Sequence, residues 1–154
     1  MFKRLLIPTI TKRFNSSLPF PDSLSKALNP VGYVKWKMGV IDAGRTNYEE
    51  CAQQFEKLDL KLPSTFQSWF SVTILHVWMI NKRLSLEGEL GRDLQKEMIN
   101  HIWLDAEIKL HQAGVKAKIN SIVSDLVGQY QGNTLGYDEG LFYGDQILAG
   151  ALWR

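Results

Sequence analysis

Three side chains that could bind a metal ion recur at four-residue spacing: Glu97, His101 and Asp105. A helix would place all three on one face, because residues four apart are neighbours on its surface. Imidazole and carboxylate groups are common ligands of zinc and other transition metals. A carboxylate-bridged metal centre in a helical protein normally draws its ligands from two or more helices, and no second ligand motif accompanies this one. The spacing therefore favours a solvated or hydrogen-bonded face, with His101 paired to Asp105 or Glu97.

A second side chain suited to chemistry, His76, lies inside the apolar run 66–79. A neutral imidazole in such surroundings needs a hydrogen-bond partner. Its neighbours at helical spacing, Thr73 and Ile80, offer no general base. We therefore expect a hydrogen-bonded core histidine. The alternative is an axial haem ligand, because haem iron accepts imidazole.

The single cysteine, Cys51, excludes an internal disulfide and a cysteine-based metal cluster. Free cysteine is usually a small buried residue, so we expect Cys51 to pack in the core beside Tyr48 and Phe55. It has no assignable catalytic partner, and the sequence has no Gly-x-Ser-x-Gly element of the kind that presents a hydrolase serine. The sequence therefore predicts no enzymatic activity and no cofactor.

The segment Gly136–Gly140 combines two glycines with an aromatic residue and two acids. Glycine at both ends predicts a sharp turn that exposes Tyr137, Asp138 and Glu139, within a loop that runs from residue 131 to residue 144. The segment lacks the lysine and hydroxyl of a phosphate-binding loop, and its acids would repel phosphate. Two interpretations remain open: the acids cap the following segment, or the loop contacts a protein partner.

Positive charge is concentrated at the N-terminus. Residues 1–17 hold four basic residues and no acidic one, although the whole chain has a formal net charge of only +2. The rest of the chain therefore carries a net charge of −2, which argues against nucleic-acid binding through a dominant basic face. An acid-free segment that mixes basic, hydroxyl and scattered apolar residues is typical of a mitochondrial transit peptide. We predict a flexible transit peptide over residues 1–17, outside the fold.

The element that positions His76 is predicted to be a central helix. Ser64 is expected to be its N-cap, with Gln67 completing a capping box. The residues that follow are apolar on nearly all faces, which is typical of a buried helix. The run is too short and too often interrupted by polar residues for a membrane span, which needs about 20 mostly apolar residues. We expect Trp69, His76 and Trp78 to be structural residues of this helix.

The remaining pattern predicts further helices and no convincing strand. We expect a short helix over 20–29 ended by Asn29-Pro30, and then a helix capped by Thr46 and Glu49 that ends near Leu60. A turn over 86–91 should be followed by a long helix that Gly114 stops, carrying Leu94, Met98, His101, Ile102, Asp105 and Ile108. After it we expect a helix over 116–130 and a last helix capped by Asp145. The stretch 33–41 is open between helix and extended chain. The predicted fold class is all-α, a single compact multi-helix domain around the central buried helix.

Three segments also resemble a known family. They are 68–79 followed by Arg83, then 135–140, and then 148–154. Their residues, order and spacing resemble the signature of the ubiquinol–cytochrome c chaperone family, which comprises mitochondrial assembly factors for respiratory complex III. Three motifs in order are more specific than any one alone. The resemblance covers about residues 62–154 and includes Gly136 and Gly140 as structural motif residues.

The resemblance implies an α-helical chaperone of the mitochondrial matrix, peripheral to the inner membrane, that promotes complex III assembly. The implied partners are newly made cytochrome b, a small complex III assembly partner protein and the mitochondrial ribosome, with peripheral contact to the inner membrane and no direct nucleic-acid specificity. The residues expected at a partner-binding surface are Arg83, Tyr137, Asp138, Glu139, Trp153 and Arg154.

The expected organisation is a transit peptide over 1–17, an N-terminal helical extension over 18–61, and a chaperone-like domain over 62–154. The family pattern continues beyond the Ala-Leu-Trp-Arg segment, so we expect this domain to be short at its C-terminus. The alternative function is a permanent helical adaptor subunit of a mitochondrial ribosome or respiratory complex.

Overall fold

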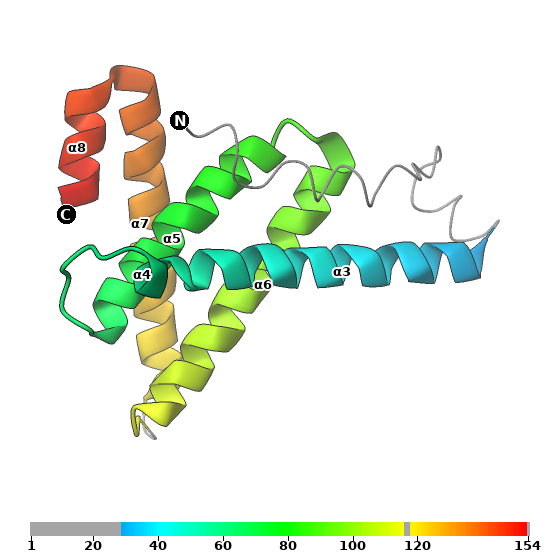
Figure 1. The fold of residues 1–154 in the computed structure, drawn as a ribbon, viewed down its shortest axis with the longest axis horizontal. Coiled ribbons are helices and arrows are strands. Elements are labelled where there is room, and N and C mark those ends of the chain that lie inside the picture. The colour runs from blue at the N-terminus through cyan, green and yellow to red at the C-terminus, as the bar shows by residue number, and fades with distance from the viewer. Residues whose placement is uncertain (1–28, 116–117, 154) are drawn as a thin grey trace. The chain divides into compact units, whose positions relative to one another are not determined.

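The computed structural model describes residues 29–115 and 118–153, and these residues form helices joined by short connections (Figure 1). The helices are α3 (Pro30–Ala52), α4 (Gln54–Lys57), α5 (Phe66–Leu84), α6 (Gly88–Gln112), α7 (Ile119–Tyr143) and α8 (Asp145–Trp153). No strand occurs in the described residues, which confirms the predicted all-α class. Within these ranges no helix combines the length and the apolar character needed to cross a bilayer. The predicted transit peptide and the predicted helix over 20–29 lie outside the described residues.

By compactness the chain divides into two units, residues 1–43 and residues 44–154, and the division falls within α3. In the first unit, Asn29 begins α3 because its Oδ1 accepts a hydrogen bond from the Gly32 N–H at 2.9 Å. Pro30 is the first helical residue, a position where proline is favoured because its missing N–H costs no bond. The open stretch 33–41 is helical, whereas the helix that Asn29-Pro30 was expected to end lies outside the described residues.

Residues 44–154 contain the core, built by three long helices that all contact one another: α5, α6 and α7. In Figure 1, α5 and α6 run side by side in opposite directions, and α7 crosses behind α5 before α8 turns back along it. The central position predicted for α5 is confirmed, because Phe70, Ile74 and Val77 are fully buried. The α6 contribution recurs every four residues, at Leu94, Met98, Ile102, Ala106 and Leu110.

The ends of the helices were predicted to within a residue or two in some cases and missed in others. Thr65, not Ser64, caps α5, and its side chain accepts from the Ser68 N–H at 3.2 Å. The stop at Gly114 is confirmed: Gly114 has φ +83° and donates to the His111 carbonyl, while the Val115 N–H reaches the Leu110 carbonyl. This pair of bonds is a Schellman motif, which requires a left-handed residue that glycine adopts without strain.

Three other expectations are wrong. Thr46 and Glu49 lie inside α3 rather than at a helix start, because α3 continues from Pro30 to Ala52. The expected turn over 86–91 is shorter, since α6 already begins at Gly88. Asp145 is the first residue of α8 rather than a residue before it. Ile108 lies on α6 as expected and is 45% exposed, because the buried face of α6 follows the four-residue series that passes through Ala106 and Leu110.

Candidate partner-binding site

The segment Gly136–Gly140 is part of a continuous helix and not a loop, so the expected exposed turn is wrong. Its glycines face α8 at a close helix crossing. A Cβ atom on Gly140 would lie 2.5 Å from the Cα atom of Leu148, and one on Gly136 would lie 3.4 Å from the Cβ of Ala151. The glycines therefore allow the backbones of α7 and α8 to approach closely. The packing that this gives outweighs the destabilisation from the weak helix propensity of glycine. The chain reverses direction only at Gly144, with φ +110°.

Tyr137 lies on a different side of α7 and is buried, only 5% exposed, which corrects the expectation that it is available to a partner. Its ring packs on Trp78 of α5 with ring centroids 5.2 Å apart. Burial raises the pKa of the Tyr137 hydroxyl, which therefore stays protonated at neutral pH. The two aromatic residues join α5 to α7 and are structural.

Asp138 completes this joint between α5 and α7. The Trp78 indole Nε1–H donates to Asp138 Oδ1 at 2.7 Å, and Lys82 Nζ donates to Asp138 Oδ2 at 2.7 Å. The pair with Lys82 is more than 40% exposed on both sides, so it contributes less than about 1 kcal/mol. The bond from the buried indole contributes more, because its acceptor is charged. Asp138 therefore stabilises the contact between α5 and α7. Neither the partner-contact interpretation nor the capping interpretation predicted this role.

We expect Asp138→Asn to lower the free energy of unfolding by about 1–2 kcal/mol, because the indole N–H loses a charged acceptor. The matched control is Glu139→Gln on the neighbouring exposed residue, which should change the free energy by less than about 0.5 kcal/mol. Urea denaturation followed by circular dichroism measures both. Equal effects of the two substitutions would contradict the structural role of Asp138.

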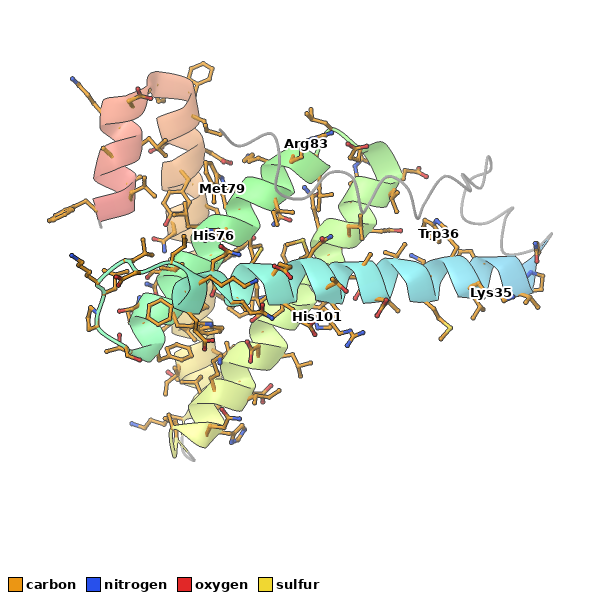
Figure 2. All side chains as sticks on the ribbon, viewed as in Figure 1. Lys35, Trp36, His76, Met79, Arg83 and His101 are labelled. Atoms are coloured by element: carbon orange, nitrogen blue, oxygen red, sulfur yellow. The ribbon has the colours of Figure 1, made fainter. Side chains whose placement is uncertain are left out.

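His76 is half-buried on α5 and not deep in the core as expected. Its Nδ1 lies 2.8 Å from the Val72 carbonyl oxygen, which can only accept, so Nδ1 carries the proton. The predicted hydrogen bond is thus present, within one helical turn. Figure 2 shows His76, Met79 and Arg83 following one another along α5. Arg83 forms an exposed ion pair with Glu87 at 2.7 Å.

The three candidate metal ligands lie on one helix, α6, as predicted. Two of them, His101 and Asp105, contact Tyr48 of α3. The Tyr48 hydroxyl on α3 donates to Asp105 Oδ2 at 2.7 Å, and the Tyr48 ring stacks on His101 with centroids 6.1 Å apart. Burial, and then the bond to Asp105, raises the pKa of Tyr48. The described residues contain no group of three or more histidine, cysteine or carboxylate side chains placed to hold a metal ion. Among the described residues His101 forms no hydrogen bond with Asp105 or Glu97, the two partners expected for it, and its ring instead stacks on Tyr48.

Cys51 is buried as predicted. Burial, followed by the nearby Glu50 charge, raises the pKa of its thiol to about 12. The thiol therefore remains protonated at neutral pH and is a poor nucleophile. Its environment is that of a core residue.

The expected partner-binding residues thus separate into two groups. Tyr137 and Asp138 belong to the joint between α5 and α7, whereas Arg83, Glu139 and Trp153 are exposed. Trp153 is 92% exposed on α8, and Arg154 lies outside the described residues. Sequence reasoning missed the close contact of Leu148 with Gly140 and the exposure of Phe142. A signal for the close contact was present, since glycine recurs every four residues from Gly128 to Gly144.

Comparison with known proteins gives a consistent family. The profile of the family described as ubiquinol-cytochrome C chaperone matches residues 58–154. Ubiquinol-cytochrome c reductase complex assembly factor 1 of Mus musculus is 35% identical over 130 residues, which cover 81% of this chain and 43% of the mouse protein. The Homo sapiens protein of the same name is 36% identical over 132 residues, with the same coverage. "Protein CBP3, mitochondrial" of Saccharomyces cerevisiae is 35% identical over 112 residues, 68% of this chain and 32% of the yeast protein.

The chain spans less than half the length of these three curated relatives. No solved structure matches it significantly. The matched segment contains α5, α6, α7 and α8 entire. The family description names a chaperone, in agreement with the non-enzymatic role predicted from the sequence. By the extent of the profile match and of the identity to these relatives, the chain belongs to the ubiquinol-cytochrome c chaperone family.

Proposed function

We propose that this protein is a mitochondrial assembly factor for respiratory complex III that acts by binding proteins. The observation that carries the proposal is the family match over residues 58–154, which spans the helical core. The relatives named as complex III assembly factors support the pathway, and the yeast relative named as mitochondrial supports the location. The basic, acid-free segment 1–17 supports import into the same compartment.

The finer part of the proposal concerns the client. Newly made cytochrome b is held near the mitochondrial ribosome, together with a small assembly partner, by a protein peripheral to the matrix side of the inner membrane. A chaperone for an apolar client needs exposed apolar surface, and α8 has no buried residue while Phe142 and Trp153 are largely exposed. Arg83, Glu139, Trp153 and Arg154 remain the candidate contact residues, without Tyr137 and Asp138.

Depletion of the protein from its source cells tests the proposal. We expect assembled complex III, resolved on native gels, to fall severalfold while complex IV monomer keeps its level. Re-expression of the full chain should restore complex III. Unchanged complex III after depletion would contradict the proposed function.

The alternative function is that of a permanent adaptor subunit. The amount of the protein in mature particles distinguishes it from a chaperone. An assembly factor is expected to be absent from purified mature complex III and from purified mitochondrial ribosomes washed at high salt. A subunit would remain with one of them in fixed proportion.

A further inference from the structure

The hairpin formed by α7 and α8 exposes large apolar side chains near its turn and along α8. Phe142 is 83% exposed and Trp153 is 92% exposed, and the described residues of α8 include none that is buried. The exposed apolar residues of the hairpin are Leu135, Leu141, Phe142, Tyr143, Ile147, Leu152 and Trp153. Isolated exposed apolar residues are ordinary, but a cluster of this kind marks an interaction surface.

The same hairpin is acidic. Residues 119–153 contain four acidic residues and no lysine, arginine or histidine. Asp138 is engaged by Trp78 and Lys82, whereas Asp125, Glu139 and Asp145 are exposed. Among the described residues Glu139 has no ion-pair partner. The surface therefore combines exposed apolar side chains with acidic side chains that no basic residue of 119–153 balances.

The two properties meet on one face of α7. Leu135, Glu139 and Phe142 follow one another at i, i+4 and i+7, which places them in a row along the helix. We call this row the outer face of α7. Tyr137 on another side of α7 packs against α5, so α5 does not cover the outer face. Asp145 follows directly after the turn at Gly144 and adds a second negative charge at the same end of the hairpin.

We propose that the outer face of α7, with the adjoining end of α8, binds a basic amphipathic helix of a partner protein. The apolar stripe of that helix packs on Leu135 and Phe142, and its lysine or arginine residues lie beside Glu139 and Asp145. An anionic lipid surface would be repelled by the same charges that attract such a helix. The inference rests on the proposed function only in taking the bound molecule to be a protein.

A pair of synthetic probes tests the charge preference directly. One is an amphipathic peptide of leucine and lysine, about 18 residues long so that it can form a helix. The other has glutamate in place of every lysine. We expect the purified full chain to bind the lysine peptide about tenfold or more tightly than the glutamate peptide, with an affinity that falls as salt is raised. Equal binding of the two peptides would overturn the proposal.

Two matched pairs of variants locate the site. Glu139→Lys should weaken lysine-peptide binding about fivefold or more, whereas Glu107→Lys, the same charge change on exposed α6, should not. Phe142→Ala should weaken lysine-peptide binding to a similar extent, whereas Leu86→Ala at another largely exposed apolar residue should not. Thermal melts confirm that each variant is folded. Equal losses in test and control variants would show a nonspecific charge or apolar effect and would overturn the proposal.

Vesicles separate a protein partner from a membrane. Vesicles of phosphatidylcholine and phosphatidylglycerol should not bind the chain through this surface. If they bind, and Phe142→Ala abolishes that binding while peptide binding is absent, the surface is lipid-binding and the proposal is wrong. Because these experiments use purified protein, their failure would leave the complex III phenotype on depletion unaffected, and the two proposals fail separately.

Discussion

Replacing Gly140 by alanine is expected to lower the free energy of unfolding by about 2 kcal/mol, although alanine is the better helix former. The added Cβ would lie 2.5 Å from the Cα and 2.7 Å from the Cβ of Leu148. One of these atoms belongs to the α8 backbone, so the conflict cannot be relieved by rotating a side chain. The helix α8 must move away from α7, and the contacts along the whole hairpin weaken.

Gly132→Ala and Gly128→Ala are matched controls in the same helix and at the same four-residue spacing. A Cβ at either position meets no atom within 4 Å. These substitutions should stabilise the protein by about 0.5–1 kcal/mol, through helix propensity and a less flexible unfolded chain. Urea denaturation gives the free energies, and hydrogen exchange of residues 145–153 reports the loosening of α8. Equal effects of all three substitutions would show that the close approach at Gly140 is not required.

Trp78→Ala is expected to lower the free energy of unfolding by about 3–5 kcal/mol. Trp78 is 6% exposed, packs on Tyr137 and donates its indole N–H to Asp138. Its removal leaves a cavity between α5 and α7 and an acidic side chain without its buried donor. Thermal unfolding of the full chain measures the loss.

Trp78→Phe separates the two contributions. Phenylalanine keeps most of the ring contact with Tyr137 but has no N–H to donate to Asp138. Trp78→Phe should therefore lower the free energy of unfolding by the loss due to the smaller ring plus about 1–2 kcal/mol for the missing hydrogen bond. An unchanged melting temperature for Trp78→Ala would contradict the burial of this residue.

The helical class and the central helix could be predicted because they depend on local periodicity. The apolar residues of α5 occupy nearly all its faces, and the structure buries Phe70, Ile74 and Val77 in the middle of the core. The stop at Gly114 was also predictable, since its backbone conformation favours glycine. These features need no knowledge of which helices meet.

The segments with glycine were predicted poorly because helix propensity is a local preference that packing can override. Gly44 lies inside α3, where a Cβ would be 2.6 Å from the Cβ of Glu97, and Gly140 lies inside α7 against Leu148. In both cases a close approach between helices explains the glycine, and a turn does not. The four-residue recurrence of glycine in α7 was the feature of the sequence that distinguishes the two interpretations.

The joint between α5 and α7 could not be predicted, because its members are far apart in the chain. Trp78 and Asp138 are separated by 60 residues. The contact between α3 and α6 was unpredictable for the same reason, since Tyr48 and Asp105 are separated by 57 residues. Helical spacing relates residues only within one helix, so Asp138 and Tyr137 were expected to be exposed. In the structure both lie on the side of α7 that contacts α5. Glu139 was correctly expected to be exposed, and among the described residues no such long-range contact involves it.

The most direct test of the account is to label mitochondrial translation products briefly and purify the tagged full chain after increasing chase times. We predict that newly made cytochrome b copurifies at the earliest time and leaves the protein as complex III matures, while labelled subunits of complex IV are not enriched. A chain that captures no labelled cytochrome b at any time, or that keeps a constant amount of it in mature complex III, would contradict the account.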